Sequence, residues 1–266
     1  MEKRENLGWA VADHGERHAG TPSSGPGWLV ILPDSFLGML TDNQRSSLLG
    51  LGSNTIYRPG QIIMHEGNPG NAVVVILRGL ARVAIHSEDG KEVLLGFRSS
   101  GDLIGEMAVM SSSTRLRSAT VAAVTELRGN FIGAASFVAY LERSPQVARR
   151  VSDIISDKLR AASRRRLEYN AYPAEVRLAC ILAEVALTYG YAEGATWRIG
   201  PEITQADLAS LGSVSVRTIE KILRIMEGQG MVARHRRDLI ITDLAALQAR
   251  CRSLSVTRPG RDSLPC

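Results

Sequence analysis

A short apolar stretch of the chain holds three side chains that could bind a polar ligand. Glu106, Arg117 and Ser118 lie in the run GEMAVMSSSTRLRSA at residues 105–119, among small, apolar and hydroxyl residues. A guanidinium is permanently charged and can bind two oxygen atoms of an anion at once, and a hydroxyl can add a hydrogen bond. The alternative is a buried ion pair between Arg117 and Glu106 without a ligand, although buried pairs stabilise proteins poorly.

A second chemically suggestive set lies near the C-terminus. Thr204 and Ser215 each precede a short apolar-patterned helix, and the turn GSV separates the two helices. Two short helices joined by a tight turn predict a helix-turn-helix. The following run, MVARHRRDLIITD, predicts two strands around the basic tip Arg236-Arg237, which is the wing of a winged helix.

The residue types in this motif suit nucleic-acid contacts. The second helix of such a domain lies in the major groove with its N-terminal residues at the base edges. Arginine can bond guanine, and valine can contact a thymine methyl group. The residues expected at the bases are Ser215, Val216, Arg217, Thr218 and Lys221. The residues expected at phosphates are Thr204, Gln205, Arg236 and Arg237.

The first half of the chain must then position the anion site. Residues 34–52 predict short helices closed by glycine, and short apolar or alternating runs follow as far as Glu126, separated by turns such as RPG, GNPG and EDGK. This spacing favours a small antiparallel barrel or roll, with a hairpin turn at Asp89-Gly90.

A long helix links the two halves. It is predicted to begin at Ser144-Pro145, with Ser144 as its N-cap, and to end before Pro173. Its heptad-like stripe comprises Val147, Val151, Ile154, Lys158 and Ala161, and the charge of Lys158 breaks it. A long helix that its own domain covers poorly pairs most simply with its copy in a second subunit. The alternative is a helix packed on the barrel.

These motifs together carry a family resemblance. Residues 86–123, HSEDGKEVLLGFRSSGDLIGEMAVMSSSTRLRSATVAA, resemble the phosphate-binding cassette of cyclic-nucleotide-binding domains. The order roll, long helix and winged helix is similar to the CRP/FNR (catabolite activator) family of bacterial transcription regulators over roughly residues 34–250. The resemblance implies an α+β fold: an N-terminal β-roll, a long dimerisation helix and a C-terminal winged helix-turn-helix.

The resemblance also implies roles for residues of the cassette. Arg117 and Ser118 would bind the phosphate, Glu106 would accept from the ribose 2′-OH, and Gly105 would let the backbone approach closely. Two adjacent hydroxyl residues on the long helix meet the base in cyclic-AMP-binding relatives. Ser163 fits that pattern and Ala162 does not.

The chain also departs from the usual family residues at other positions. Ile104 stands where an aromatic residue is common, and Val216-Arg217 replaces a frequent Arg-Glu pair. Ser213 occupies the turn position where the family usually has glycine, and the glycine of this chain precedes it as Gly212.

The expected function is therefore sequence-specific transcription regulation controlled by a cyclic nucleotide, with cyclic AMP the first candidate. The alternative is a regulator of the same fold with an empty sensor or another ligand, such as a cyclic dinucleotide.

An enzyme is not expected, because no P-loop, GxSxG or HExxH motif occurs. Neither a metal nor a haem, for which only His65 or His86 would serve, is expected. The expected partners are double-stranded DNA, a second copy of the chain and RNA polymerase, and no membrane.

Composition sets broader limits. The chain has 266 residues, of which 44% are hydrophobic, and a net charge of +5, which favours an anionic partner. Three scattered cysteines without a CxxC pair argue against zinc and against a disulfide framework, and Cys180 is expected in the core. No signal peptide or membrane span is evident, so the expected location is the cytoplasm.

The predicted organisation has five parts. These are a disordered extension at 1–33, the β-roll at 34–143, the dimerisation helix at 144–172, the winged helix at 173–250 and a flexible tail at 251–266.

Overall fold

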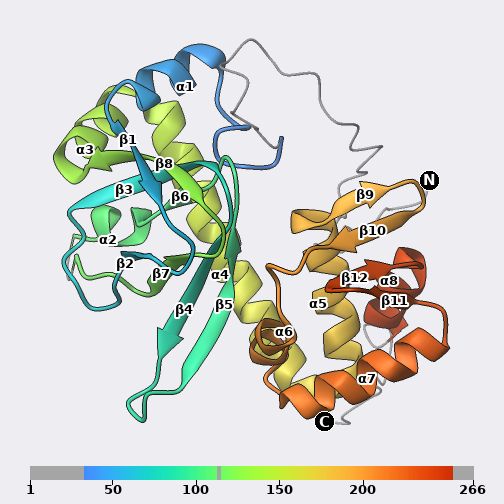
Figure 1. The fold of residues 1–266 in the computed structure, drawn as a ribbon. Coiled ribbons are helices and arrows are strands. Elements are labelled where there is room, and N and C mark those ends of the chain that lie inside the picture. Colours follow the sequence, from blue (N-terminus) through green and yellow to red (C-terminus); the bar gives the residue numbers. More distant parts are fainter. Residues whose placement is uncertain (1–32, 113–114, 254–266) are drawn as a thin grey trace, which may run out of the picture.

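The computed structural model describes residues 33–112 and 115–253. A roll of strands lies on one side of the molecule and a helical domain on the other, and the long helix α4 (Pro145–Ala171) runs from the first to the second (Figure 1). The extension predicted before residue 33 and all but three residues of the predicted tail lie outside the described residues. None of the helices within the described ranges is long and apolar enough to cross a membrane.

The roll consists of two four-stranded antiparallel sheets, which confirms the fold predicted for this half. Their strand orders are β1-β8-β3-β6 and β2-β7-β4-β5. The strands are β1 (Ser53–Tyr57), β2 (Ile62–Met64), β3 (Ala72–Arg78), β4 (Ala81–His86), β5 (Glu92–Arg98), β6 (Leu103–Ile104), β7 (Thr120–Ala123) and β8 (Leu127–Gly133). As predicted, Asp89 and Gly90 lie in the turn of the β4–β5 hairpin, where Gly90 has φ +79°.

The unbroken apolar run of β3 is explained by burial on both of its faces. Val73, Val75 and Leu77 pack in a core shared with α3 (Ala134–Arg143) and α4. Val74 and Ile76 pack in the interior of the roll. A strand buried on both faces has no polar side to alternate with, so the period-2 pattern disappears.

Strand β8 was not predicted, although it lies between β1 and β3. Its sequence, LRGNFIG, contains two residues that are rare in strands, Gly129 and Asn130. A Cβ at Gly129 would lie 2.6 Å from Cγ1 of Val74. Asn130 is buried and donates to the carbonyl of Leu49 at 3.1 Å, so tertiary contacts override the local preference.

The N-terminal half of α4 packs on its own roll. Val147 and Val151 are fully buried in the roll's core and Ile154 packs beside them. The expectation that its own domain covers this helix poorly is therefore wrong for its first turns. Leu159 and Leu167 in the second half are 67% and 61% exposed. Ser144 is the N-cap residue of α4 and Pro145 follows at its first turn, as predicted, but the Ser144 side chain makes no capping hydrogen bond.

The C-terminal domain contains the predicted helix-turn-helix and wing. Helices α6 (Gln205–Gly212) and α7 (Val216–Gly228) follow α5 (Ala174–Tyr189), and a sheet of order β11-β12-β10-β9 flanks them. Its strands are β9 (Tyr191–Glu193), β10 (Thr196–Ile199), β11 (Val232–His235) and β12 (Asp238–Ile241). The hairpin β9–β10 was not predicted.

The chain continues into α8 (Leu244–Ser253), so the flexible tail predicted from residue 251 is wrong for its first three residues. Cys251 in α8 is disulfide-bonded to Cys180 in α5. The expectation of no disulfide is therefore wrong as well, and Cys180, which was expected in the core, is half-buried. The odd number of cysteines misled the prediction, because only two of the three need to pair.

Candidate ligand pocket and nucleic-acid interface

Gly105 occupies a position that no other residue fits without strain. It joins β6 to the short helix α2 (Glu106–Met110) with φ +85°, in the left-handed region. A Cβ at this position would lie 2.4 Å from Nη1 of Arg117. Both the conformation and the close approach of Arg117 therefore require glycine.

Arg117 is a buried cation held mainly by neutral groups. It is 7% exposed, and its guanidinium donates to the carbonyl of Gly105 at 3.0 Å and to that of Ala72 at 2.7 Å. Burial lowers the pKa of Arg117, and the negative charge of Glu106 opposes this shift. Among the described residues, the hydrogen bonds of Arg117 go to carbonyl groups, which do not neutralise its charge, so an anion nearby would be strongly favoured.

The buried carboxylate of Glu106 has an unexpected partner. Glu106 is 2% exposed, and its Oε1 accepts from Nζ of Lys158 on α4 at 2.7 Å. Nζ also donates to the carbonyl of Leu103 at 3.2 Å. Burial lowers the pKa of Lys158, and Glu106 opposes that shift.

The ion pair between Glu106 and Arg117, the alternative to a ligand site, is not formed: their charged atoms do not come within 4.0 Å among the residues of the structural description. In the sequence, Lys158 stands out as a charged residue in an apolar stripe, but the pattern could not indicate that it pairs with Glu106, 52 positions away.

The remaining predicted ligand residues lie further from this cluster of contacts. Ser118 is exposed, and its hydroxyl makes a weak contact of 3.8 Å with Sδ of Met107. Ser163 is exposed on α4, five residues after Lys158, and within the described ranges it makes no side-chain hydrogen bond to the cassette. The structure thus brings Gly105, Glu106 and Arg117 together but does not join Ser163 to them.

The first helix of the helix-turn-helix begins with a complete capping box. Oγ1 of Thr204 accepts from the amide of Asp207 at 3.2 Å, and Oδ2 of Asp207 accepts from the amide of Thr204 at 2.9 Å. Thr204 is exposed and Gln205 is half-buried at this end of α6. Ser213 takes the left-handed turn conformation with φ +51°, so a non-glycine residue carries the strain of the turn.

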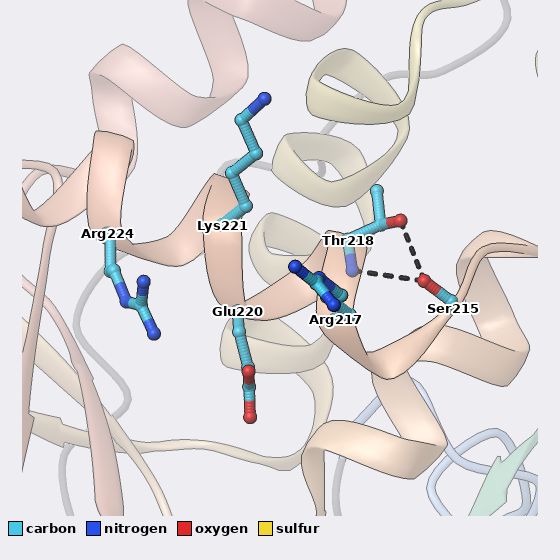
Figure 2. Close-up of a pocket in the computed structure, with 6 residues that line it drawn as sticks. All are labelled: Ser215, Arg217, Thr218, Glu220, Lys221 and Arg224. Atoms are coloured by element: carbon cyan, nitrogen blue, oxygen red, sulfur yellow. Dashed lines mark hydrogen bonds between the residues drawn. The ribbon is translucent and has the colours of Figure 1, made fainter.

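The second helix, α7, presents its polar face to an open hollow of about 870 Å³ (Figure 2). Ser215 caps α7 by accepting from the amide of Thr218 at 3.1 Å. Val216 is 41% exposed, and Arg217 and Lys221 are exposed on the same side. The lining residues are Ser215, Arg217, Thr218, Glu220, Lys221 and Arg224. The sequence prediction missed Glu220 and Arg224, although Arg224 lies seven positions after Arg217 and so on the same helix face.

The wing is attached to the end of α7. Arg234 on β11 donates to Oε2 of Glu227 at 2.6 Å, and this hydrogen bond lowers the pKa of Glu227. Arg236 and Arg237 are exposed at the tip of the hairpin, where Arg236 has φ +56°. The basic tip thus projects beyond a hairpin that is held to the helix.

The roll contacts the helix-turn-helix through the β4–β5 hairpin. The amide of Leu94 donates to Oγ of Ser210 on α6 at 2.8 Å, and Nη2 of Arg82 lies 3.3 Å from Oδ1 of Asp207. The ring of Phe97 packs edge-on against Tyr189 of α5, at 5.6 Å between centroids. The two functional regions are therefore joined by direct contacts as well as by α4.

Comparison with known proteins agrees with this geometry. Residues 55–144 match the cyclic nucleotide-binding domain, and residues 176–250 match the Crp-like helix-turn-helix domain. The CRP-like cAMP-activated global transcriptional regulator of Mycobacterium tuberculosis is 24% identical over 193 residues, which cover 73% of this chain and 85% of that protein.

Two solved structures share the fold. FixK2 from Bradyrhizobium japonicum superposes with a TM-score of 0.66 at 19% identity, covering 74% of this chain and 96% of FixK2. The c-di-GMP responsive global regulator CLP of Xanthomonas campestris superposes with 0.65 at 15% identity, covering 76% of this chain and 99% of CLP. With both domain types matched in the order that the structure gives, the chain belongs to the CRP/FNR family of bacterial transcription regulators.

Proposed function

We propose that this protein is a transcription regulator whose affinity for specific DNA is set by a cyclic nucleotide, cyclic AMP in the first instance. The observation that carries the proposal is the buried guanidinium of Arg117, which is held by two carbonyls beneath Gly105. A cyclic phosphate would supply a negative charge to this cation, and Arg117 could bind two of its oxygens. Ser118 would add a hydroxyl donor, and the ribose 2′-OH would bind Glu106.

Binding at Glu106 would act on α4 through Lys158. A ribose hydroxyl that donates to the carboxylate competes with the 2.7 Å ion pair between Glu106 and Lys158. The ligand would therefore change what holds the middle of α4 to the cassette. Because a ligand shifts an equilibrium only through different contacts in two states, this exchange of partners is the proposed origin of the response.

Two routes lead from the pocket to the DNA-binding helices. One is α4 itself, which we propose as the dimer helix, with the exposed Leu159 and Leu167 facing the second copy. The other is the β4–β5 hairpin, which contacts α6 at Ser210. In a dimer these routes would set the separation of two α7 helices, and so their fit to successive major-groove faces.

The proposed DNA contacts fall into two kinds. Five residues at the start of α7 are assigned to base edges: Ser215, Val216, Arg217, Thr218 and Lys221. All but Thr218 are exposed, and all but Val216 line the hollow, which supports this assignment. Thr204 and Gln205 at the start of α6, with Arg236 and Arg237 on the wing, are assigned to phosphates. Transcription regulation would further require contact with RNA polymerase.

The pairing of Glu106 also favours a second candidate. If Lys158 keeps its ion pair with Glu106, Oε1 is no longer available to a ribose hydroxyl, and Ala162 offers no hydroxyl to a base. The site would then favour a ligand that is recognised through its phosphate groups more than through its ribose, such as a cyclic dinucleotide. CLP of Xanthomonas campestris, which shares the fold, is a c-di-GMP responsive regulator.

Calorimetric titration distinguishes the two candidates. Wild type, Arg117→Gln and the control Arg78→Gln, which alters an exposed arginine at the end of β3, would each be titrated with cyclic AMP, cyclic GMP and cyclic di-GMP. Binding of cyclic AMP by wild type and Arg78→Gln, but not by Arg117→Gln, supports the proposal. Binding of cyclic di-GMP alone supports the second candidate, and no binding of any nucleotide by folded protein contradicts both.

A further inference from the structure

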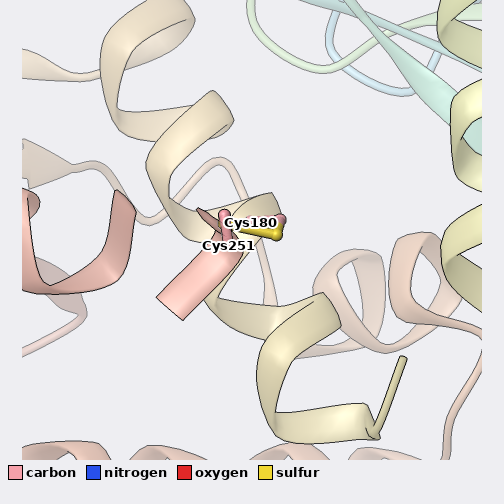
Figure 3. Close-up of a disulfide and its surroundings, with 2 residues drawn as sticks. All are labelled: Cys180 and Cys251. Atoms are coloured by element: carbon pink, nitrogen blue, oxygen red, sulfur yellow. A yellow bond between two sulfur atoms is a disulfide. The ribbon is translucent and has the colours of Figure 1, made fainter. Parts of the chain in front are cut away.

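The cysteine pair of the DNA-binding domain lies outside the ligand pocket and the DNA-reading face. Cys180 in the middle of α5 and Cys251 in the last turn of α8 form a disulfide, with their Cα atoms 5.4 Å apart and 71 positions between them in sequence (Figure 3). Both cysteine residues are half-buried, so neither is fully enclosed by the core.

Helix α8, which the disulfide holds, also contacts the end of the DNA-reading helix. Nη2 of Arg250 donates to Oε1 of Gln229, the C-cap residue of α7, at 2.7 Å, and Nη1 pairs with Glu175 at the start of α5. Leu247 is fully buried against the same core as α7. One helix thus connects α5 to the C-terminal end of α7, and the disulfide fixes its last turn.

We propose that Cys180 and Cys251 form a reversible thiol–disulfide switch, in which the oxidised form holds α7 more firmly and binds DNA more tightly. This inference rests on the proposed function. A DNA-binding regulator works in the compartment of the chromosome, where disulfides are rare and usually transient or redox-sensing. Burial of Leu247 and the contacts of Arg250 hold α8 without the disulfide, so both redox forms can keep the fold.

The chemistry is a two-electron exchange. Oxidation by a peroxide breaks the two S–H bonds and forms one S–S bond, and hydrogen peroxide takes up the two electrons and two protons to give two water molecules. Reduction by a low-molecular-weight thiol proceeds through a mixed disulfide, returns a proton to each cysteine sulfur and leaves the oxidised thiol as its own disulfide. The oxidised form is expected to bind DNA more tightly, because a helix α7 that is already fixed loses less conformational freedom on binding.

The test uses the full chain carrying Cys266→Ser, so that only the two relevant thiols remain. This protein and its Cys251→Ser derivative would be treated with hydrogen peroxide or dithiothreitol, and the disulfide counted by mass after alkylation. DNA affinity would be measured by fluorescence anisotropy on a fragment enriched from a random pool. We expect the peroxide-treated parent to bind about tenfold more tightly than the reduced parent. The Cys251→Ser derivative should match the reduced parent under both treatments.

Thermal melting gives a second readout that does not need DNA. The oxidised C-terminal domain should melt roughly 10 °C above the reduced one, and the derivative should show no such difference. Failure of peroxide to form the bond, or equal DNA affinity in the two redox forms, would overturn the switch alone. Absence of DNA binding in both forms would instead contradict the proposed function, and the switch with it.

Discussion

At the scale of single residues, the proposed nucleotide site depends on the space that Gly105 leaves for Arg117. A methyl group at Gly105 would lie 2.4 Å from Nη1 of Arg117, and φ +85° is strained for any side chain. We therefore expect Gly105→Ala to lower the free energy of unfolding by roughly 1–3 kcal/mol. Nucleotide binding should weaken at least tenfold, because the guanidinium must move. Thermal denaturation and calorimetry measure the two effects.

The matched control is Gly133→Ala, since a Cβ there meets nothing within 4 Å and its φ is −60°. This variant should bind nucleotide as wild type does. Equal binding by Gly105→Ala and Gly133→Ala would show that the close approach to Arg117 has no part in the site.

The half-buried carboxyl of Asp102, near the cassette, provides a pH-dependent prediction. Burial raises the pKa of Asp102 above its ordinary 3.8, opposed by its hydrogen bond from Ser99 and by the charges of Arg98 and Lys158. The folded protein keeps this proton to a higher pH than the unfolded chain does. The contribution of Asp102 to the free energy of unfolding therefore falls as the pH rises from 3.8 through the folded pKa, and is constant above it.

Asp102→Asn keeps an oxygen for the amide of Ser99, now 2.8 Å from Oδ2, and removes the charge. The stability of the variant relative to wild type should therefore increase with pH over the same window. Urea denaturation at several pH values from about 4 to 8 measures the difference. A difference that stays constant, or decreases with pH, would be inconsistent with a raised pKa.

At the scale of elements, the sequence could predict what depends on local pattern. The capped helices α6 and α7, the basic wing and the hairpin at Asp89-Gly90 follow from turn residues and apolar spacing, and the structure contains them. Strand β8 could not be predicted, because Gly129 and Asn130 belong there only through contacts with distant residues.

The same limit applies to the candidate site. Gly105, Glu106 and Arg117 are neighbours in sequence and meet in the structure, whereas the ion pair of Glu106 joins residues 52 positions apart. The stripe of α4 was visible, but the pattern could not tell whether Val147 and Val151 face the roll or a second copy. They face the roll.

The contact between the β4–β5 hairpin and α6 leads to a prediction at this scale. Ser210→Ala removes the acceptor for the amide of Leu94. We expect the ratio of DNA affinities with and without nucleotide to change by roughly two- to thirtyfold. Anisotropy titrations with and without cyclic AMP measure the ratio. Ser47→Ala, at an exposed position of α1 (Asp42–Leu49), should leave the ratio unchanged. An unchanged ratio in Ser210→Ala would mean that the hairpin transmits nothing.

At the scale of the whole molecule, the separate roles of α7 and the wing predict different binding defects. Arg236→Ala should weaken binding to all sequences and reduce the slope of log K against log salt by about one per protomer, because one phosphate contact is lost. Arg217→Ala should cost about 1–3 kcal/mol on the preferred sequence and relax specificity at one position. Arg78→Ala is the control for loss of a positive charge far from the motif.

Competition between selected and random fragments at several salt concentrations measures both defects. The assignment of α7 to bases and the wing to phosphates would be wrong if Arg217→Ala weakened all sequences equally, or if Arg236→Ala changed the preferred sequence.

The central claim is that one nucleotide in the roll changes the DNA affinity of the helix-turn-helix. Its most direct test is the DNA dissociation constant of the full-length protein measured as cyclic AMP is raised, for wild type and for Arg117→Gln. The proposal predicts at least a tenfold decrease in wild type and no change in the variant, with both proteins folded. A wild type that binds cyclic AMP at Arg117 but holds DNA with the same affinity at every concentration would contradict it.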